Sequence, residues 1–268
     1  MPPLPDFHLH LDVLSLLFIL AVGWWWAETR IRPLAAPAAP PATRGQRRAW
    51  YWGVAIMLIA SGYPIHDLAE ETLVSFHMLE HMLIGYVVPP LLLIGLPRWM
   101  AEATIAHPRI VGVVRHFTTP VVGIIAFNIA IVAIHWPAAI AWQNTTEWAH
   151  FAVHVLFFLT AVSMWMPVFS PTPALPRMSR PGQVMYLFMN TIVPIVPASF
   201  LTFGSSVLYP VYGDAPMTWG LTAIEDQTIA GIIMKLGGSF YLFGLIARIW
   251  FRWIGEERTL DRLERELV

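Results

Sequence analysis

The stretch SFHMLEHMLIG, residues 75–85, places two histidines and a glutamate inside a long apolar run. Read alone, His77-Met78-Leu79-Glu80-His81 matches H-x-x-E-H, a pattern of zinc peptidases. The surrounding apolar residues point elsewhere, because a bilayer core of about 30 Å requires about 20 apolar residues per helix. The stretch therefore indicates a polar site inside a membrane-crossing helix, and the rest of the chain must decide its chemistry.

The composition is that of a membrane protein. Of the 268 residues, 57% are hydrophobic and only 12% are charged, whereas soluble domains have about 25% charged residues. Cysteine is absent, which excludes disulfides and thiolate metal sites and leaves histidine, methionine and carboxylates as ligands. We therefore expect the lipid bilayer, and no nucleic acid, as a partner of the protein.

Seven apolar segments predict an all-α membrane protein, a single domain over residues 1–268 built as a bundle of seven transmembrane helices. The first segment lacks a preceding basic region and a cleavage site, so we expect a retained span. Residues 35–48 predict a cytoplasmic linker, and residues 256–268 predict an amphipathic tail on the cytoplasmic surface. The seven predicted spans are 8–28, 49–64, 72–96, 117–137, 147–168, 184–204 and 227–250.

The basic residues predict the orientation. Fifteen of the sixteen Lys and Arg residues fall on one side of the seven-span arrangement, and the outer loops carry only acidic charges. By the positive-inside rule the basic side is the cytoplasm. We expect the N-terminus outside and the C-terminus in the cytoplasm.

Eight of the ten histidines fall on the outer side or in the outer parts of the predicted spans. His77 and His81 are four residues apart, as are His150 and His154, so each pair lies on one helical face. At about 1.5 Å per residue, the two pairs lie at similar depth. A single buried histidine is usually a hydrogen-bonded contact between helices, but two pairs at matched depth predict one shared polar site.

A metal ion suits such a site, because coordination uses neutral imidazoles and ionisable groups inside a bilayer tend to be functional. Imidazole binds copper, zinc, iron and nickel, and thioether ligands add a preference for copper. We expect copper, with zinc or haem iron as alternatives. Residues that could flank the site are Glu80, Met78, Met82 and His66.

Other residues inside the spans predict local features. Lys235, the only lysine, lies in the seventh span, where we expect it to snorkel or to pair with a carboxylate. Pro89-Pro90, and Pro194 with Pro197, predict kinks in the third and sixth spans. Four glycines of the seventh span suit close helix packing; they are Gly231, Gly237, Gly238 and Gly244.

The third span, HMLEHMLIGYVVPPLLLIGLP, resembles the H-x-x-x-H…PPLL…G-x-P signature of the CtaG family, polytopic assembly factors for bacterial caa-type cytochrome c oxidases. Three further motifs resemble that family in the same order: IHWP at 134–137, H-x-x-x-H with FF and W-x-P at 150–167, and DQ…AG…M at 226–234. The resemblance covers about residues 50–250. The family's matching positions here are His77, His81, His135, His150, His154, Asp226 and Gln227.

The resemblance implies an assembly factor, not an enzyme, in the bacterial plasma membrane. Its partners would be oxidase subunits, and it would supply or insert copper from the outer side. Lys235 departs from the apolar residue expected at its position. Two alternatives stay open: a redox protein that binds haem between two histidines, and a membrane metallohydrolase that uses His77, Glu80 and His81.

Overall fold

The computed structural model describes residues 5–266, and all regular structure in that range is helical. The α-helices of the first half are α1 (Leu11–Trp26), α2 (Arg32–Ala35), α3 (Arg44–Ala60), α4 (Ile65–Glu71), α5 (Val74–Met82), α6 (Val88–Gly95), α7 (Arg98–Thr104), α8 (Pro108–Phe117) and α9 (Pro120–Ile134). Those of the second half are α10 (Pro137–Gln143), α11 (Glu147–Phe169), α12 (Arg180–Met189), α13 (Ile195–Phe203), α14 (Ala223–Ile232) and α15 (Gly238–Glu266). Three π-helical turns, η1 (Ala27–Ile31), η2 (Leu83–Val87) and η5 (Ile233–Gly237), continue α1, α5 and α14, and the 3₁₀ turns η3 (Pro210–Tyr212) and η4 (Ala215–Trp219) lie in the loop before α14.

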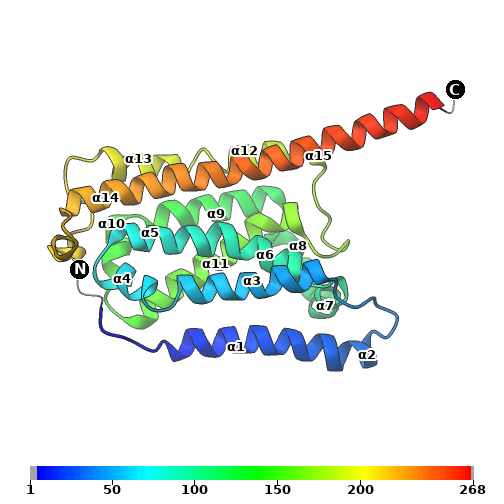
Figure 1. Cartoon of the computed structure of the whole chain (residues 1–268), viewed down its shortest axis with the longest axis horizontal. Coiled ribbons are helices and arrows are strands. Elements are labelled where there is room, and N and C mark those ends of the chain that lie inside the picture. The colour runs from blue at the N-terminus through cyan, green and yellow to red at the C-terminus, as the bar shows by residue number, and fades with distance from the viewer. Residues whose placement is uncertain (1–4, 267–268) are drawn as a thin grey trace.

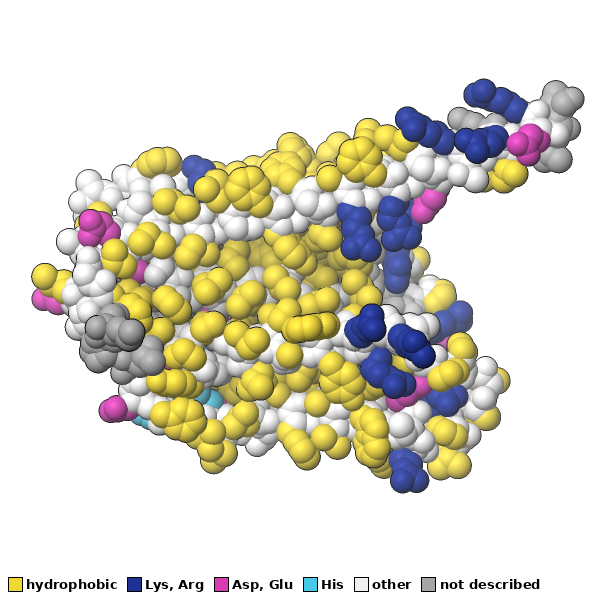
Figure 2. Space-filling model, viewed as in Figure 1, with side chains coloured by type: hydrophobic (Ala, Val, Ile, Leu, Met, Phe, Trp, Pro, Cys, Tyr) yellow, Lys and Arg dark blue, Asp and Glu magenta, His cyan; other side chains and the backbone are white. Residues whose placement is uncertain are grey.

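The long helices lie side by side as a bundle (Figure 1). Short helices lie at the two ends, with α4 and α10 at the end near the N-terminus and α7 at the other. Apolar side chains cover the flank between the ends, whereas most Lys and Arg side chains on the visible face gather at the end toward the C-terminus (Figure 2). Large exposed apolar residues such as Phe18, Ile129 and Phe240 suit a surface that faces lipid.

Four helical rods are long and apolar enough to cross a membrane: Leu11–Ala35, Val74–Gly95, Glu147–Phe169 and Ala223–Glu266. The bent pair Pro108–Phe117 and Pro120–Ile134, with 61° between its helices, makes a fifth if it is one span. Each of the seven predicted spans contains helix, but α3 has only 17 residues.

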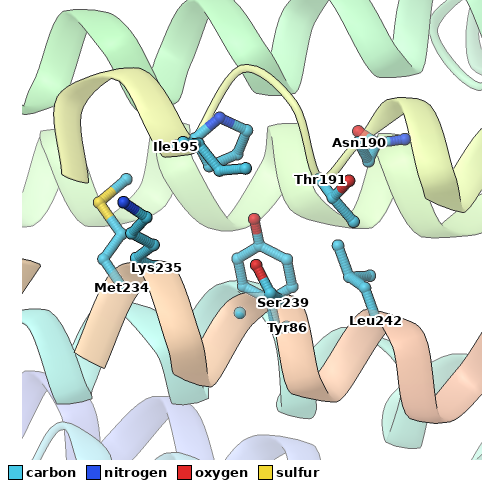
Figure 3. Close-up of a pocket in the computed structure, with 10 residues that line it drawn as sticks. Tyr86, Asn190, Thr191, Ile195, Met234, Lys235, Ser239 and Leu242 are labelled. Carbon is cyan, nitrogen blue, oxygen red and sulfur yellow. The ribbon is translucent and has the colours of Figure 1, made fainter. Parts of the chain in front are cut away.

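The sixth predicted span, residues 184–204, is not one continuous helix. It is broken between Met189 and Ile195, where Pro194 lacks an N–H group and disfavours helical backbone at the residue before it. The break borders a small pocket that also receives Tyr86, Lys235 and Ser239 from the neighbouring rods (Figure 3).

The ends of two predicted segments also differ from expectation. α3 begins at Arg44, so residues 44–48 of the predicted linker are helical; the Thr43 side chain accepts a hydrogen bond from Gln46 N and starts the helix there. The predicted tail at 256–268 is not a separate surface helix, because α15 runs unbroken to Glu266 and projects beyond the bundle (Figure 1). Residues 267 and 268 of that prediction lie outside the described range.

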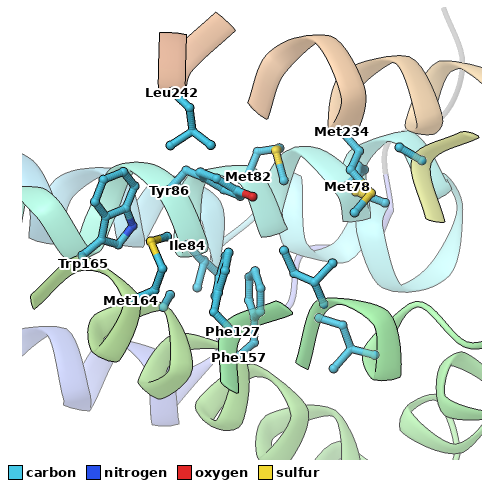
Figure 4. Close-up of a cluster of buried hydrophobic side chains, with 14 of the residues drawn as sticks. Met78, Met82, Ile84, Tyr86, Phe127, Phe157, Met164, Trp165, Met234 and Leu242 are labelled. Atoms are coloured by element: carbon cyan, nitrogen blue, oxygen red, sulfur yellow. The ribbon is translucent and has the colours of Figure 1, made fainter. Parts of the chain in front are cut away.

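The apolar core fills the middle of the bundle (Figure 4). Phe157 of α11 packs directly against Gly85, where an added Cβ would lie 2.5 Å from the Phe157 ring. Trp165 Nε1 donates to the Gly85 carbonyl at 2.9 Å, which gives a partner to a backbone group of the π-helical turn. These contacts hold η2 to α11, next to the helix that carries His77 and His81.

Met78 and Met82, predicted to flank the metal site, belong to this core. Met82 Sδ lies on the side of Gly238, 3.6 Å from the position of an added Cβ. The structure therefore gives Met82 a packing contact with the last rod.

Asp226 of α14 acts as the N-terminal cap of α5. Its carboxylate accepts hydrogen bonds from Val74 N at 2.7 Å and from Ser75 N at 3.2 Å. The N-cap residue of α5 itself provides no side-chain cap, so Asp226 takes that role. Asp226 is fully buried, so these two bonds compensate the loss of its hydration. The contact fixes the start of the helix that carries His77 and His81.

Gln227, next to Asp226, is a second structural anchor. Its Oε1 accepts from Leu208 N at 2.7 Å and its Nε2 donates to Ser206 O at 3.2 Å. The side chain thus ties α14 to the loop after α13. Both residues of the DQ motif, predicted near the metal site through the family resemblance, make these scaffold contacts.

Glycine has a steric role at only some of the four positions expected to favour close packing. A Cβ at Gly231 would lie 2.4 Å from Thr202 Oγ1, whereas one at Gly237 or Gly244 would meet nothing within 4 Å. Among these four glycines, only Gly231 lies where a Cβ would clash, at the contact of α13 with α14.

Gly231→Ala should destabilise the protein by about 1–3 kcal/mol, because the added methyl overpacks the contact with Thr202. The matched control is Gly244→Ala, where a methyl is free of neighbours and should be neutral or slightly stabilising in a helix. Thermal unfolding in detergent, followed by tryptophan fluorescence, measures both. Equal midpoints for the two variants would contradict the close approach of α13 and α14.

Asp226→Ala should also destabilise the protein, by about 1–3 kcal/mol, because it leaves two buried N–H groups of α5 without partners. Asp226→Asn should have a smaller effect, since the amide oxygen still accepts one bond. Asp214→Ala, at an exposed aspartate without a side-chain cap bond, is the control. The same unfolding assay applies, and a neutral Asp226→Ala would show that the cap is dispensable.

Candidate metal centre

Histidines from several parts of the chain converge at one end of the bundle. α5 carries His77 and His81, and α11 carries His150 and His154. His135 follows the last residue of α9, and His66 lies in α4. The i, i+4 spacing aims each pair off one face of its helix, and the capped start of α5 sets the height of its pair.

The rings of the two pairs lie against one another. The His77 and His81 centroids are 4.2 Å apart, and those of His150 and His154 are 4.4 Å apart. Across the helices, His81 and His154 are 5.2 Å apart, and His77 lies 6.2 Å from His154. With metal–nitrogen bonds of about 2.0 Å, two imidazoles on one ion have centroids about 5–6.4 Å apart, so the distances between the helices match that range.

His135 extends the cluster at its inner side. Its ring centroid lies 5.5 Å from that of His81. His135 Nδ1 donates a hydrogen bond to the Ile131 carbonyl at 2.7 Å. This bond leaves Nε2 as the nitrogen with a free lone pair, the arrangement found in metal-binding histidines.

Two glutamates join the histidines from α5 and α4. Glu80 is fully buried; its Oε1 is 2.9 Å from His66 Nδ1 and 3.6 Å from His154 Nδ1. Glu70 Oε1 lies 3.1 Å from His150 Nδ1 and 3.5 Å from His66 Nε2. The sequence interpretation assigned no role to Glu70, although His66 and Glu70 have the i, i+4 spacing that would have placed them on one face of a helix.

Within the described residues, one group of three has donor atoms that all lie within 4.8 Å of one another: His66, Glu70 and His150. His77, His81 and His154 are packed beside this group but do not meet the same limit. The cluster therefore has one compact group with a carboxylate, and beside it a group of three imidazoles that Glu80 contacts at His154.

The donor atoms fit a metal ion chemically. Several buried nitrogens in the cluster have no hydrogen-bond partner: both of His81, both of His150, Nδ1 of His77, and Nε2 of His135 and His154. His150 Nδ1 is close to Glu70 but lacks hydrogen-bond geometry. Buried polar atoms are nearly always paired in proteins, and a metal ion is a partner for the one lone pair that each neutral imidazole carries.

Two polar side chains act on histidines of the cluster: Glu80 affects the charge of His66, and Gln143 contacts the ring of His77. Burial alone lowers the pKa of His66, but the neighbouring Glu80 carboxylate outweighs it and raises the pKa to about 9. Gln143 of α10 places Nε2 3.5 Å from His77 Nε2. Nothing in the sequence had marked Gln143, because α10 is brought over α5 only by the fold.

Lys235 is remote from any described carboxylate partner. Its Nζ lies 4.8 Å from the centroid of the Phe203 ring, a cation–π contact. The contact with Phe203 is not the ion pair with a carboxylate that was one of the two expectations for this lysine. It also does not make Lys235 a metal ligand.

Comparison with curated proteins and with solved structures found distant relatives but no similar structure. Two curated relatives are uncharacterized proteins of Mycobacterium bovis and Mycobacterium tuberculosis, each 20% identical over 269 residues, which is 92% of this chain. The chain spans 39% of the length of each relative. No solved structure matches the chain.

The model of the family described as cytochrome c oxidase caa3 assembly factor matches residues 16–256. This range begins within α1, ends within α15 and includes every histidine of the cluster. The chain therefore belongs to the caa3 cytochrome c oxidase assembly factor family.

Proposed function

We propose that the protein binds copper through the histidine cluster and supports maturation of a copper centre in cytochrome c oxidase. The observation that carries the proposal is the convergence of buried imidazole nitrogens without hydrogen-bond partners, from α5, α9 and α11. Unpaired polar groups inside an apolar bundle are costly, so their accumulation at one place argues for a ligand. Family membership supplies the biological setting, assembly of the oxidase.

In this proposal the bundle crosses the bacterial plasma membrane seven times, with the N-terminus outside. α3, at about 25 Å, and the broken rod α12–α13 would be the short spans. The concentration of Lys and Arg at the end opposite α4 supports this orientation by the positive-inside rule (Figure 2). The histidine cluster then lies near the outer surface, where an oxidase subunit could receive the ion.

The chain's own residues would hold the ion and set its release. Neutral imidazoles of the two helical pairs supply soft to borderline nitrogen ligands. Glu80 orients the rings of His66 and His154, as carboxylates outside the ligand set do in many metal sites, whereas Glu70 can itself contribute an oxygen ligand beside His66 and His150. Copper is the cargo in this scheme, and oxidase subunits are the acceptors.

The same geometry disfavours the two alternatives. A haem would need a flat slot between two ligands, whereas the six clustered rings lie 4.2–6.3 Å from their neighbours. A hydrolase of the H-x-x-E-H type needs its glutamate free to activate water, whereas Glu80 is fully buried and contacts two histidines.

Copper retention tests the proposal directly. Wild-type protein, purified in lipid nanodiscs with a tag free of histidine and loaded under reducing conditions, should retain copper measured by mass spectrometry. His77→Ala/His154→Ala should lower the affinity about a hundredfold or more, because it removes one imidazole from each helical pair. His116→Ala, at an exposed histidine outside the cluster, should leave retention unchanged; a wild type that retains no copper would refute the proposal.

The variant Glu80→Gln distinguishes a copper-binding protein from a metallohydrolase. The amide keeps the size of the side chain but loses the charge that faces His66, so copper affinity should fall about 10–100-fold. Oxidase activity in membranes of cells that carry this variant should fall, and added copper should restore it. Loss of oxidase activity that copper does not restore, with the metal still bound, would favour the hydrolase instead.

A further inference from the structure

A second group of metal-binding residues lies between the N-terminal segment and α4. His8 and His10 precede α1 in a non-helical stretch, and both reach the same carboxylate. His8 Nδ1 is 3.2 Å from Asp67 Oδ1, and His10 Nε2 is 3.5 Å from Asp67 Oδ2. Alternate residues of an extended chain point to one side, which explains how one aspartate faces both rings.

Asp67 is an unusual residue to bury. Its side chain is 1% exposed, and no Lys or Arg among the described residues pairs with it. Its Oδ2 has no hydrogen-bond donor, and the facing His10 Nε2 is also buried without a partner. A carboxylate in such a place needs a cation or donors, and these two atoms approach each other without bonding.

The exposure of the group falls from the surface inward. The His8 side chain is 56% exposed, that of His10 is 22% exposed, and Asp67 is enclosed. Histidine side chains reach the surface at the end of the bundle remote from most arginines (Figure 2). An ion arriving from solvent can therefore meet His8 directly, whereas the His66 and His150 side chains of the cluster are only 9% and 7% exposed.

The group also leads to that cluster. The His10 ring is 4.7 Å from the ring of His66, and His66 is 5.3 Å from His150. His66 and Asp67 are neighbours in α4, so one short helix serves both groups. The family match begins at residue 16, so both N-terminal histidines lie outside the region that defines the family.

We propose that His8, His10 and Asp67 form a second, exchangeable site for a divalent transition-metal ion, at the entrance to the histidine cluster. Two imidazoles and one carboxylate suit ions of borderline softness such as Zn²⁺ and Cu²⁺. The donor atoms of these three residues do not all lie within 4.8 Å of one another, so the exposed His8 ring turns toward the ion when it binds. The role of this site in loading the cluster rests on the proposed function, whereas the existence of the site does not.

Zinc, which is redox-inactive, is the probe. Zinc titration by calorimetry, on the full chain in nanodiscs and with a tag free of histidine, should show one equivalent fewer for His8→Ala/His10→Ala than for wild type. His107→Ala/His116→Ala is the matched control, because it removes two exposed histidines at other positions and should lose nothing. Asp67→Asn should weaken the same equivalent about tenfold or more, with an unchanged melting temperature in the absence of zinc to show that the variant folds.

The outcomes distinguish this site from the histidine cluster. Unchanged stoichiometry in His8→Ala/His10→Ala would overturn the inference and leave the proposed function untouched. Loss of all zinc in that variant would also overturn it, because the N-terminal histidines would then belong to a single shared centre. If His77→Ala/His154→Ala abolishes copper retention but keeps the zinc equivalent that His8 and His10 supply, the two sites are separate.

Discussion

Polar groups buried in an apolar bundle must find partners, and this requirement governs the end of the structure that carries the histidine cluster. Where water is excluded, an imidazole or a carboxylate without a partner costs several kcal/mol. Asp226 meets the requirement by capping α5, and Gln227 meets it by binding the loop after α13. The inner histidines do not meet it with protein atoms alone, which distinguishes them from the scaffold residues around them.

The scaffold explains why the histidines can converge. Asp226 fixes the start of α5, and the contact of Gly85 with Phe157 and Trp165 holds the same rod against α11. Phe157 is also the neighbour of His81, at 5.0 Å between ring centroids. The site thus rests directly on the apolar core, so changes in packing below it would alter the spacing of its rings.

The cluster combines carboxylates with imidazoles. Glu70 is one-third exposed and joins His66 and His150, whereas Glu80 is fully buried and contacts His66 and His154. Under the proposed function, a partly exposed carboxylate beside buried imidazoles suits an ion that is taken up, held and passed on. This arrangement agrees with a role in assembling a metal-containing oxidase.

The sequence by itself determined the helical membrane architecture, since apolar segment length and the placement of charges follow from the bilayer as solvent. It also determined that His77 and His81, and His150 and His154, share faces, because helical periodicity is local. Only the tertiary structure decided that Glu70 and Gln143 lie beside them, that the His10 ring meets His66, and that Met82 faces the last rod. It likewise showed that Asp226 and Gln227 are anchors, and that the kink which Pro194 predicts in the sixth span is a full break of the helix. Those facts depend on contacts between residues as far apart as Ser75 and Asp226, and no local pattern encodes which distant helix face will pack against which.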